Sequence, residues 1–293
     1  MGSTFSGSAV TETIPSVGDN IYATLAELKE QLTAPGQTIS VDSADDGILQ
    51  AILNAVSRVM DEQTSRRFYP KIETRYYDVP GNSRDLPLDG DLLEIITLTN
   101  GDTVVLTTAD YYLHPKNSTP YFVVRLKQSS SYYWAQDGDG NTEDVISVKG
   151  IWGYHDDYAN AWLTGSTLAE ELDISELPLT IASETLFAAD QIIRVENELT
   201  IVASVNSADV TVVKRAENGS TAATHATGTT VKIWQPMSSV KRAALLIAES
   251  EYKKRYGENE SGVARVTAMG VVITPAGFPR LAKEIINTLI RRS

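Results

Sequence analysis

The residues whose types and spacing come nearest to a known site are Asp137, Asp139 and Asn141, which alternate with glycines. This spacing copies positions 1, 3 and 5 of a calcium loop, in which carboxylate and amide oxygens of one turn surround the ion. The copy then fails, because position 6 is Thr142 instead of glycine and position 12 is Val148 instead of a bidentate Glu. The pattern therefore favours a polar hairpin turn, and we expect no metal ligands.

Other groups that could do chemistry do not form a recognisable set. The histidines, His114, His155 and His225, lie far apart, and none has a partner at the helical spacing of a zinc pair. Nucleophile-elbow, phosphate-loop and dinucleotide patterns are missing from the sequence. Carboxylate pairs such as Asp156-Asp157 and Glu170-Glu171 could serve a glycoside hydrolase, but in so acidic a chain such pairs arise by chance. We therefore expect no catalytic residue, no cofactor and no enzymatic activity.

The composition narrows the class of protein. The 293 residues allow one large domain or two modest ones, and 42% of them are hydrophobic, as in ordinary globular proteins. The chain contains no cysteine, which suits a protein made in a reducing cytoplasm. No apolar run approaches the roughly 18 residues of a membrane span, and the first twenty residues lack the order of a signal peptide, so we expect neither.

The charge is distributed unevenly along the chain. Residues 236–293 contain ten Lys or Arg and five Asp or Glu, a charge of +5, which leaves −18 for residues 1–235 of the total −13. An acidic body opposes nucleic-acid binding, because affinity for phosphate comes mainly from clustered cations. The basic end is either a solvated helix face or a docking surface for an acidic partner, and the charge pattern leaves both open.

The sequence predicts helices near both ends of the chain. Thr24 and Glu27 form a capping box for a short helix, and a second helix begins near Asp42 or Ser43 and carries aliphatic residues at helical spacing. After Pro236, residues 238–256 predict a long helix, and the chain finishes in another helix.

Between these ends the hydrophobic period changes to two, which is typical of strands between turns. In the first block, which ends at residue 154, the pattern predicts strands near residues 72–79, 93–99, 103–107, 121–127 and 145–152. In the second block it predicts strands at 192–195, 199–205, 210–214 and 230–233.

These elements predict an α+β fold, in which the N- and C-terminal helices form a helical bundle with a small antiparallel β region and an inserted β-rich, barrel-like domain. The expected organisation is a flexible arm (1–20), a helical core (21–71 and 236–293), an antiparallel β region (72–154), a linker (155–177) and an inserted β domain (178–235).

Several stretches resemble the head-tail connector, or adaptor, proteins of long-tailed bacteriophages. From residue 21 to 77 the chain contains IYATLAELKEQL and TSRRFYPKIETRYY, which are similar to the family's opening helix, its T-x-R-x-F-Y turn and the following strand. Val148 to Tyr154, VKGIWGY, resembles the family's V-x-G-x-W-G-Y strand, and Gly277 through Arg292 resembles its closing helix. The resemblance covers residues 21–154 and 236–293, and the segment from Lys214 to Ser220 with His225 is similar to a small β domain that decorates some connectors.

The resemblance implies a structural role in the virion neck, after assembly in the host cytoplasm. It implies a ring of about twelve copies beneath the portal, with a heterologous interface repeated around an axis. The implied partners are the portal protein, a stopper or tail-terminator protein, other copies of the chain, and viral DNA that passes through without sequence-specific binding. The acidic body would let the DNA slide without sticking.

Four cations at the basic end are the candidate portal-docking residues: Arg280, Lys283, Arg291 and Arg292. For Arg66 and Arg67 we favour a simpler interpretation without a docking role: they are exposed charges in the last turn of a helix, where cations suit the helix dipole.

A carbohydrate-binding or glycan-hydrolysing virion or tail component is the alternative function. It would use the acidic pairs and, as a platform for sugar rings, the aromatic residues Tyr132, Tyr133, Trp134, Tyr158 and Trp162. Aromatic clusters more often belong to a core or an interface.

Overall fold

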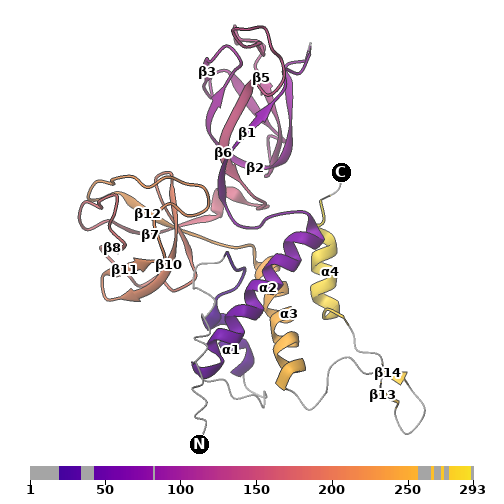
Figure 1. Cartoon of the computed structure of the whole chain (residues 1–293), viewed down its shortest axis with the longest axis vertical. Coiled ribbons are helices and arrows are strands. Elements are labelled where there is room, and N and C mark those ends of the chain that lie inside the picture. Colours follow the sequence, from indigo (N-terminus) through magenta and orange to yellow (C-terminus); the bar gives the residue numbers. More distant parts are fainter. Residues whose placement is uncertain are drawn as a thin grey trace, which may run out of the picture.

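The chain folds into three parts that meet at a common waist (Figure 1). The computed structural model describes residues 20–33, 43–81, 83–256, 265–266, 272–273 and 277–291. Below, the helical lobe denotes helices α1 to α4, the sheet lobe denotes residues 71–152 with strands β1 to β6, and the barrel denotes residues 162–234 with strands β7 to β12. In Figure 1 the sheet lobe stands above the helical lobe, and the barrel projects to one side.

The helical lobe contains the α-helices of the described residues. They are α1 (Leu25–Thr33), α2 (Asp46–Thr64), α3 (Ser238–Tyr256) and α4 (Arg280–Leu289), with a 3-10 turn η1 (Ser43–Asp45) before α2. The predicted capping box is confirmed, since the Glu27 amide donates to Thr24 Oγ1 at 3.2 Å and the Thr24 amide donates to Glu27 Oε2 at 2.8 Å. Apolar stripes of all four helices share one core around Leu28, Leu53 and Ile247, which are fully or almost fully buried.

The sheet lobe is a six-stranded antiparallel sheet in the order β1-β6-β2-β5-β4, with β3 paired to β2. Its strands are β1 (Lys71–Tyr77), β2 (Asp85–Thr99), β3 (Val105–Leu106), β4 (Tyr111–His114), β5 (Tyr121–Leu126) and β6 (Ile146–Trp152). Inward-facing residues such as Leu98, Val124 and Val148 are completely buried in its core. A separate pair of short strands, β13 (Arg265–Val266) and β14 (Val272–Ile273), lies near α4 in the chain.

The second antiparallel sheet has the order β7-β12-β9-β10-β11-β8. A bridge between Leu168 and Ile181 joins the segments that extend its two end strands, so the sheet closes into a barrel. Its strands are β7 (Trp162–Thr167), β8 (Pro178–Thr180), β9 (Ile192–Val195), β10 (Glu198–Asn206), β11 (Asp209–Val212) and β12 (Thr230–Trp234). The range 155–177, which we expected to be a linker, therefore contributes β7 and the short turn η2 (Tyr158–Asn160) to the folded structure.

The sheet lobe and the barrel share a buried apolar contact. Ile72, Leu93 and Ile151 of the sheet lobe pack with Leu199 and Trp234 of the barrel, and each is at most 4% exposed. Apolar area removed from water stabilises such a contact by roughly 25 cal/mol per Å². The waist is therefore a packed joint between the two lobes.

The predicted fold class is wrong. Strands make up 32% and helices 25% of the described residues, and the two six-stranded sheets dominate them, so the structure is mostly β and is not a helical bundle with β excursions. The physical reason is that glycine or proline weakens the strand signals of β7, β8 and the first half of β2, and that β4 has only four residues, whereas amphipathic helices carry strong signals. The predicted arm, residues 1–20, lies outside the described residues except for Asn20, and none of the described helices is long and apolar enough to cross a membrane.

Candidate functional site

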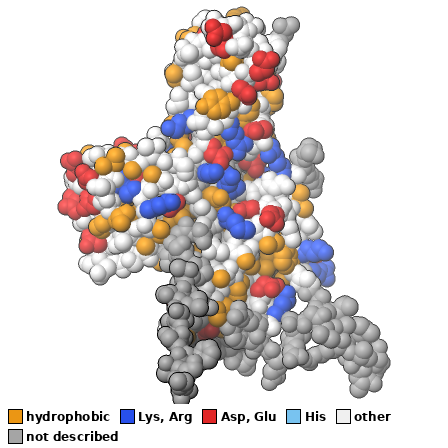
Figure 2. Space-filling model, in the orientation of Figure 1, with side chains coloured by type: hydrophobic (Ala, Val, Ile, Leu, Met, Phe, Trp, Pro, Cys, Tyr) orange, Lys and Arg blue, Asp and Glu red, His pale blue; other side chains and the backbone are white. Residues whose placement is uncertain are grey.

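Some of the residues that carry the sequence resemblance come together at the waist, whereas no residue of the opening-helix stretch IYATLAELKEQL lines the same pocket. A pocket of about 440 Å³ is lined by residues of the α2 end, β1, β2, β6 and the segment after α4. Its charged lining comprises four arginines and three aspartates: Arg66, Arg67, Arg75, Arg291, Asp61, Asp89 and Asp91. We call it the junction pocket. Segments that lie far apart in the sequence thus meet at one charged place. Figure 2 shows basic and acidic side chains mixed across the waist.

Arg66 is largely buried at the junction pocket and is not the exposed charge that the sequence predicted. Its side chain is 12% exposed and its Nη1 atom lies 3.4 Å from both carboxylate oxygens of Asp91, while its guanidinium lies 3.9 Å from the ring centre of Tyr154. Its buried Nε atom has no hydrogen-bond partner. Burial raises the pKa of Asp91 above its ordinary value, although Arg66, Arg291 and Arg75 favour the ionised form.

A tighter set of ion pairs surrounds Glu73 on β1. Arg67, Lys71 and Arg75 reach its carboxylate at 3.1, 2.6 and 3.0 Å, and the Arg75 guanidinium also lies 4.0 Å from the ring centre of Trp152. Burial opposes ionisation of Glu73, but the hydrogen bonds from Lys71 and Arg75 prevail and lower its pKa to about 2. These charges are paired with one another, so they fix the sheet lobe against the end of α2.

Gly153 allows the close approach of two backbones in the junction pocket. A Cβ atom at this position would lie 2.6 Å from the Tyr69 carbonyl oxygen, and its φ of 151° is rarely adopted by other residues. The Gly153 amide donates to the Asp91 carbonyl at 2.9 Å, and the Tyr154 amide donates to the Arg67 carbonyl at 2.6 Å. The W-G-Y stretch is therefore a backbone link between sheet and helix.

The structure separates the four predicted portal-docking residues. Arg280 and Lys283 are exposed near the start of α4, where Arg280 pairs with Glu284 at 2.9 Å. Arg291 follows α4 and lines the junction pocket, and its amide donates to the Thr64 carbonyl at 2.9 Å. Arg292 lies outside the described residues.

The predicted sugar platform is also divided. Tyr158 and Trp162 line a groove of about 610 Å³ between the sheet lobe and the barrel, together with Glu94, Arg194 and other polar residues. Tyr132, Tyr133 and Trp134 belong instead to the sheet lobe, where Trp134 is buried and its indole donates to the Arg84 carbonyl at 3.1 Å.

Glu94 and Arg194 form an ion pair across this groove. Arg194 Nη1 and Nη2 lie 2.8 and 2.9 Å from the two carboxylate oxygens of Glu94, which also accepts a 2.6 Å hydrogen bond from the Tyr158 hydroxyl. Burial opposes ionisation, but the hydrogen bonds from Arg194 and Tyr158 lower the pKa of Glu94. A general acid in a glycosidase needs the opposite shift, so this carboxylate is suited to joining two lobes and not to donating a proton.

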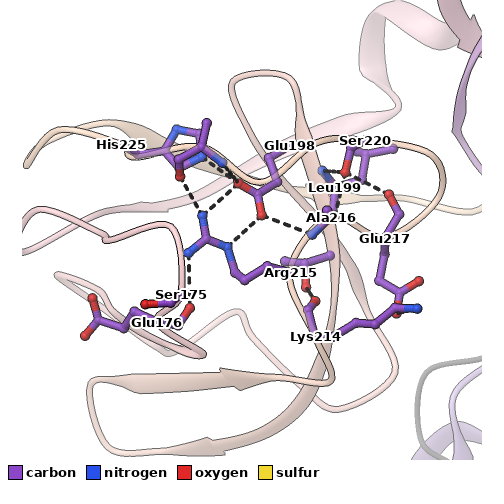
Figure 3. Close-up of polar contacts among 12 residues, drawn as sticks. Ser175, Glu176, Glu198, Leu199, Lys214, Arg215, Ala216, Glu217, Ser220 and His225 are labelled. Carbon is purple, nitrogen blue, oxygen red and sulfur yellow. Dashed lines mark hydrogen bonds and ion pairs between the residues drawn. The ribbon is translucent and has the colours of Figure 1, made fainter.

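A buried polar network holds the loop of the barrel that follows β11 (Figure 3). Arg215 Nε and Nη2 donate to the two oxygens of Glu198 at 2.6 and 2.7 Å, and the same carboxylate accepts from the Ala216 and Ala223 amides at 3.1 and 3.0 Å. His225 Nε2 lies 2.9 Å from Glu198, and its Nδ1 lies 2.8 Å from Glu196.

This Glu198 network was not predicted from the sequence. Glu198, Arg215 and His225 are distant in the chain and are charged or polar types that usually lie at the surface, yet their side chains are at most 7% exposed. Burial opposes ionisation of Glu198, but the hydrogen bonds from Arg215 and His225 lower its pKa. The paired charges and backbone amides of the network hold the loop after β11 against β10, so we call the network a structural clamp.

The Asp137 segment forms a polar turn as predicted, but it lies in the long loop between β5 and β6 and is not the expected hairpin turn. The Asp137 carboxylate accepts hydrogen bonds from the Asp139 and Asn141 amides at 2.9 and 2.8 Å, and the Asn141 side chain holds its pKa below the ordinary value. Among the described residues no cluster of three or more His, Asp or Glu could hold a metal ion. Neither a family model, nor a curated protein, nor a solved structure matches the chain.

Proposed function

We propose that this chain is a structural subunit of the neck of a long-tailed bacteriophage, a head-tail connector adaptor without an active site. Its copies form a ring of about twelve beneath the portal, around a channel for the viral DNA. The ring offers a docking site to a stopper or tail-terminator protein, and it belongs to the virion after assembly in the host cytoplasm.

The observation that carries the proposal is the convergence of the resembling motifs on the junction pocket. Arg66 and Arg75 belong to one stretch, residues 21–77, and they line the pocket together with Gly153 and Arg291 from two further stretches. Gly153 and Arg291 lie far from residues 64–77 in the sequence, and the fold brings parts of all three resembling stretches to one place. The ion pairs around Glu73 and the backbone link at Gly153 fix the lobes to one another, and a ring subunit needs such a fixed shape because each interface angle is repeated around the axis.

The charges fit the proposed partners. Arg280 and Lys283 project from α4 as exposed cations and offer a contact to an acidic portal rim. The net charge of −13 weakens attraction between the ring and DNA phosphates, so DNA can pass through the channel.

Imaging of the purified protein tests the ring directly. Negative-stain images and native mass spectra of the chain, alone and with the portal protein encoded by the same phage, should show closed rings of about a dozen copies with a central hole. A protein that stays monomeric even with the portal present contradicts the proposal.

Charge reversal tests the docking face. The double variant Arg280→Glu, Lys283→Glu should bind the portal about tenfold more weakly, with a smaller salt dependence, because rim charges steer association. The matched control, Lys149→Glu with Lys214→Glu, makes the same change of charge on the sheet lobe and the barrel and should bind as the unmodified chain does. Equal binding by both variants would remove α4 from the docking face.

Carbohydrate binding is the second candidate, because Tyr158 and Trp162 share a groove with the polar groups of Glu94, Arg194 and Asn197. It predicts a saturable change in tryptophan fluorescence on titration with soluble oligosaccharides, abolished in Trp162→Ala. A stable monomer that gave this signal would favour the second candidate over the connector.

A further inference from the structure

A cationic groove runs along the outer part of the sheet lobe. It has a volume of about 720 Å³ and is lined by residues of β4, β5 and the segments beside them. Its charged lining consists of four cations and one carboxylate: Arg84, Lys116, Arg125, Lys127 and Asp85. In a chain with a net charge of −13, this concentration of positive charge requires an explanation.

The positive charge of the groove is only partly neutralised. Arg125 forms a two-pronged pair with Asp85, with both contacts at 2.5 Å. The hydrogen bonds and ring contacts of the other three cations are to neutral groups: Lys127 donates to the Thr108 carbonyl at 2.6 Å, Arg84 donates to the Lys127 carbonyl at 2.5 Å, and the Lys116 ammonium lies 5.5 Å from the ring centre of Tyr112. Lys127 also lies close enough to the Asp110 carboxylate to help lower its pKa. The groove therefore attracts an anionic partner.

Among the residues that the structure describes, no element outside the sheet lobe occupies the groove. All residues that line the groove belong to the sheet lobe or its loops, so the barrel of the same subunit does not fill it. The Tyr112 ring already has the ammonium group of Lys127 at 4.7 Å, in addition to that of Lys116, which leaves its face less available for stacking on a nucleic-acid base. An acidic protein segment fits this groove better.

The barrel presents such a segment in the loop 169–177. Glu170, Glu171 and Asp173 are exposed there, and Ile174 is 54% exposed beside them. Figure 2 shows acidic side chains gathered at the outer end of the barrel.

The loop is already ordered before any contact. Leu172 is 3% exposed and exchanges backbone hydrogen bonds with His225 at 2.9 and 3.0 Å. Arg215 of the Glu198 network donates to the Asp173 and Glu176 carbonyls at 2.5 and 3.1 Å. A segment held in this way loses little conformational freedom on binding.

We propose that the cationic groove of one subunit binds the acidic loop 169–177 of a neighbouring copy of this chain. Donor and acceptor surfaces lie on different lobes, so the contact is head to tail and repeats from copy to copy, as a ring requires. The inference rests on the proposed ring assembly and names the surfaces that build it.

Cross-linking of the full chain tests the contact. Because the chain has no cysteine, Gln128→Cys beside the groove and Ser175→Cys in the loop create the only thiols. With a short bismaleimide, the double-cysteine chain should give a ladder of dimers, trimers and larger products. Each single-cysteine variant is the control and should give no ladder, since a head-to-tail contact joins different sites.

Charge reversal in the double-cysteine chain tests whether the cross-links depend on the proposed contact. Lys116→Glu with Lys127→Glu in the groove, or Glu170→Lys with Glu171→Lys in the loop, should each reduce the ladder at least about tenfold. All four changes in one chain should restore it, because the charges are again complementary, and the Lys149→Glu, Lys214→Glu variant should leave it intact.

A missing ladder, or one that ignores these reversals, overturns the inference. So does binding of short duplex DNA that is lost with the groove reversal while the ladder is unchanged, because DNA is then the occupant of the groove. The cross-links report contact between copies whether or not a portal is present, so their failure leaves portal docking through α4 and ring formation by another contact to be judged by imaging.

Discussion

Two buried arginine–carboxylate pairs in this molecule differ in how completely they are satisfied. In the barrel, Glu198 meets Arg215 at 2.6 and 2.7 Å and also accepts from two backbone amides and His225. At the junction pocket, Arg66 meets Asp91 only at 3.4 Å, and its Nε atom has no partner.

We call the fully hydrogen-bonded Glu198–Arg215 pair of the barrel a clamp, and the incompletely hydrogen-bonded Arg66–Asp91 pair of the junction pocket a joint. Burying charged groups costs free energy that only well-made hydrogen bonds offset, and the barrel pair meets that condition while the junction pair does not. The direction of the pKa shift agrees, since the pKa of Glu198 is lowered and that of Asp91 is raised by burial. The barrel network is thus built for stability, whereas the Arg66–Asp91 pair at the junction pocket is less completely satisfied.

The largest effect is expected in the barrel. Glu198→Gln leaves the Arg215 charge buried without its counter-charge and should lower the free energy of unfolding by about 3–5 kcal/mol, measured by urea denaturation. Glu196→Gln is the control, because that side chain is 63% exposed, and it should cost less than about 1 kcal/mol. Similar losses from both variants would contradict the distinction between clamp and joint.

A backbone change should come second. Gly153→Ala places a Cβ atom against the Tyr69 carbonyl and should lower the free energy of unfolding by about 1–3 kcal/mol. Gly138→Ala is the matched control, since no atom lies within 4 Å of its added Cβ, and it should leave the urea midpoint nearly unchanged. If Gly153→Ala behaved like the control, the joint would be looser than described.

The pH dependence of stability should differ in sign between two carboxylates of the junction. The pKa of Glu73 falls from 4.5 to about 2, so its contribution is complete above about pH 4.5 and is lost as the pH falls towards 2. Asp91 has a raised pKa, so its ionisation lowers stability as the pH rises. Urea midpoints between pH 5 and pH 3 should therefore fall less steeply in Glu73→Gln and more steeply in Asp91→Asn, and parallel curves would contradict this.

The smallest effect is expected on α4. Arg280→Ala removes an ion pair whose partners are 91% and 57% exposed, and it should change the free energy of unfolding by less than about 0.5 kcal/mol. Portal binding should nevertheless weaken, because the exposed cation is available for docking. A loss of more than about 1 kcal/mol would show that the residue supports the fold instead.

Much of the local structure could be predicted from the sequence. The capping box of α1 and the span 238–256 of α3 are confirmed, because end signals and helical spacing are local properties. The early part of β2 was missed because Pro87, Gly90 and neighbouring aspartates are turn residues, and β8 was missed because it has only three residues and begins with Pro178. These omissions led to the wrong fold class.

The candidate sites were harder to predict. The arginines of the T-x-R-x-F-Y turn are visible in the sequence, but their partner Asp91 lies 25 residues beyond Arg66 in a strand that looks like a turn. Glu198, Arg215 and His225 carry no spacing that marks them as neighbours, because strand pairing in the barrel brings them together. Partners that depend on tertiary register cannot be seen in local patterns.

The loop of the barrel that carries Asn218 ties the barrel to the sheet lobe and to the start of the helical lobe. The Asn218 carbonyl accepts the Ile72 amide at 2.8 Å, and Gly219, at φ +74°, passes so close to the Ile72 carbonyl that a Cβ would lie 2.2 Å away. Asn218 and Asn20 also exchange side-chain hydrogen bonds at 2.8 and 2.7 Å. Removal of the barrel would leave the Ile72 amide without its hydrogen-bond acceptor and would expose apolar side chains of β1 to water. Shorter versions of this chain would therefore need different residues in β1.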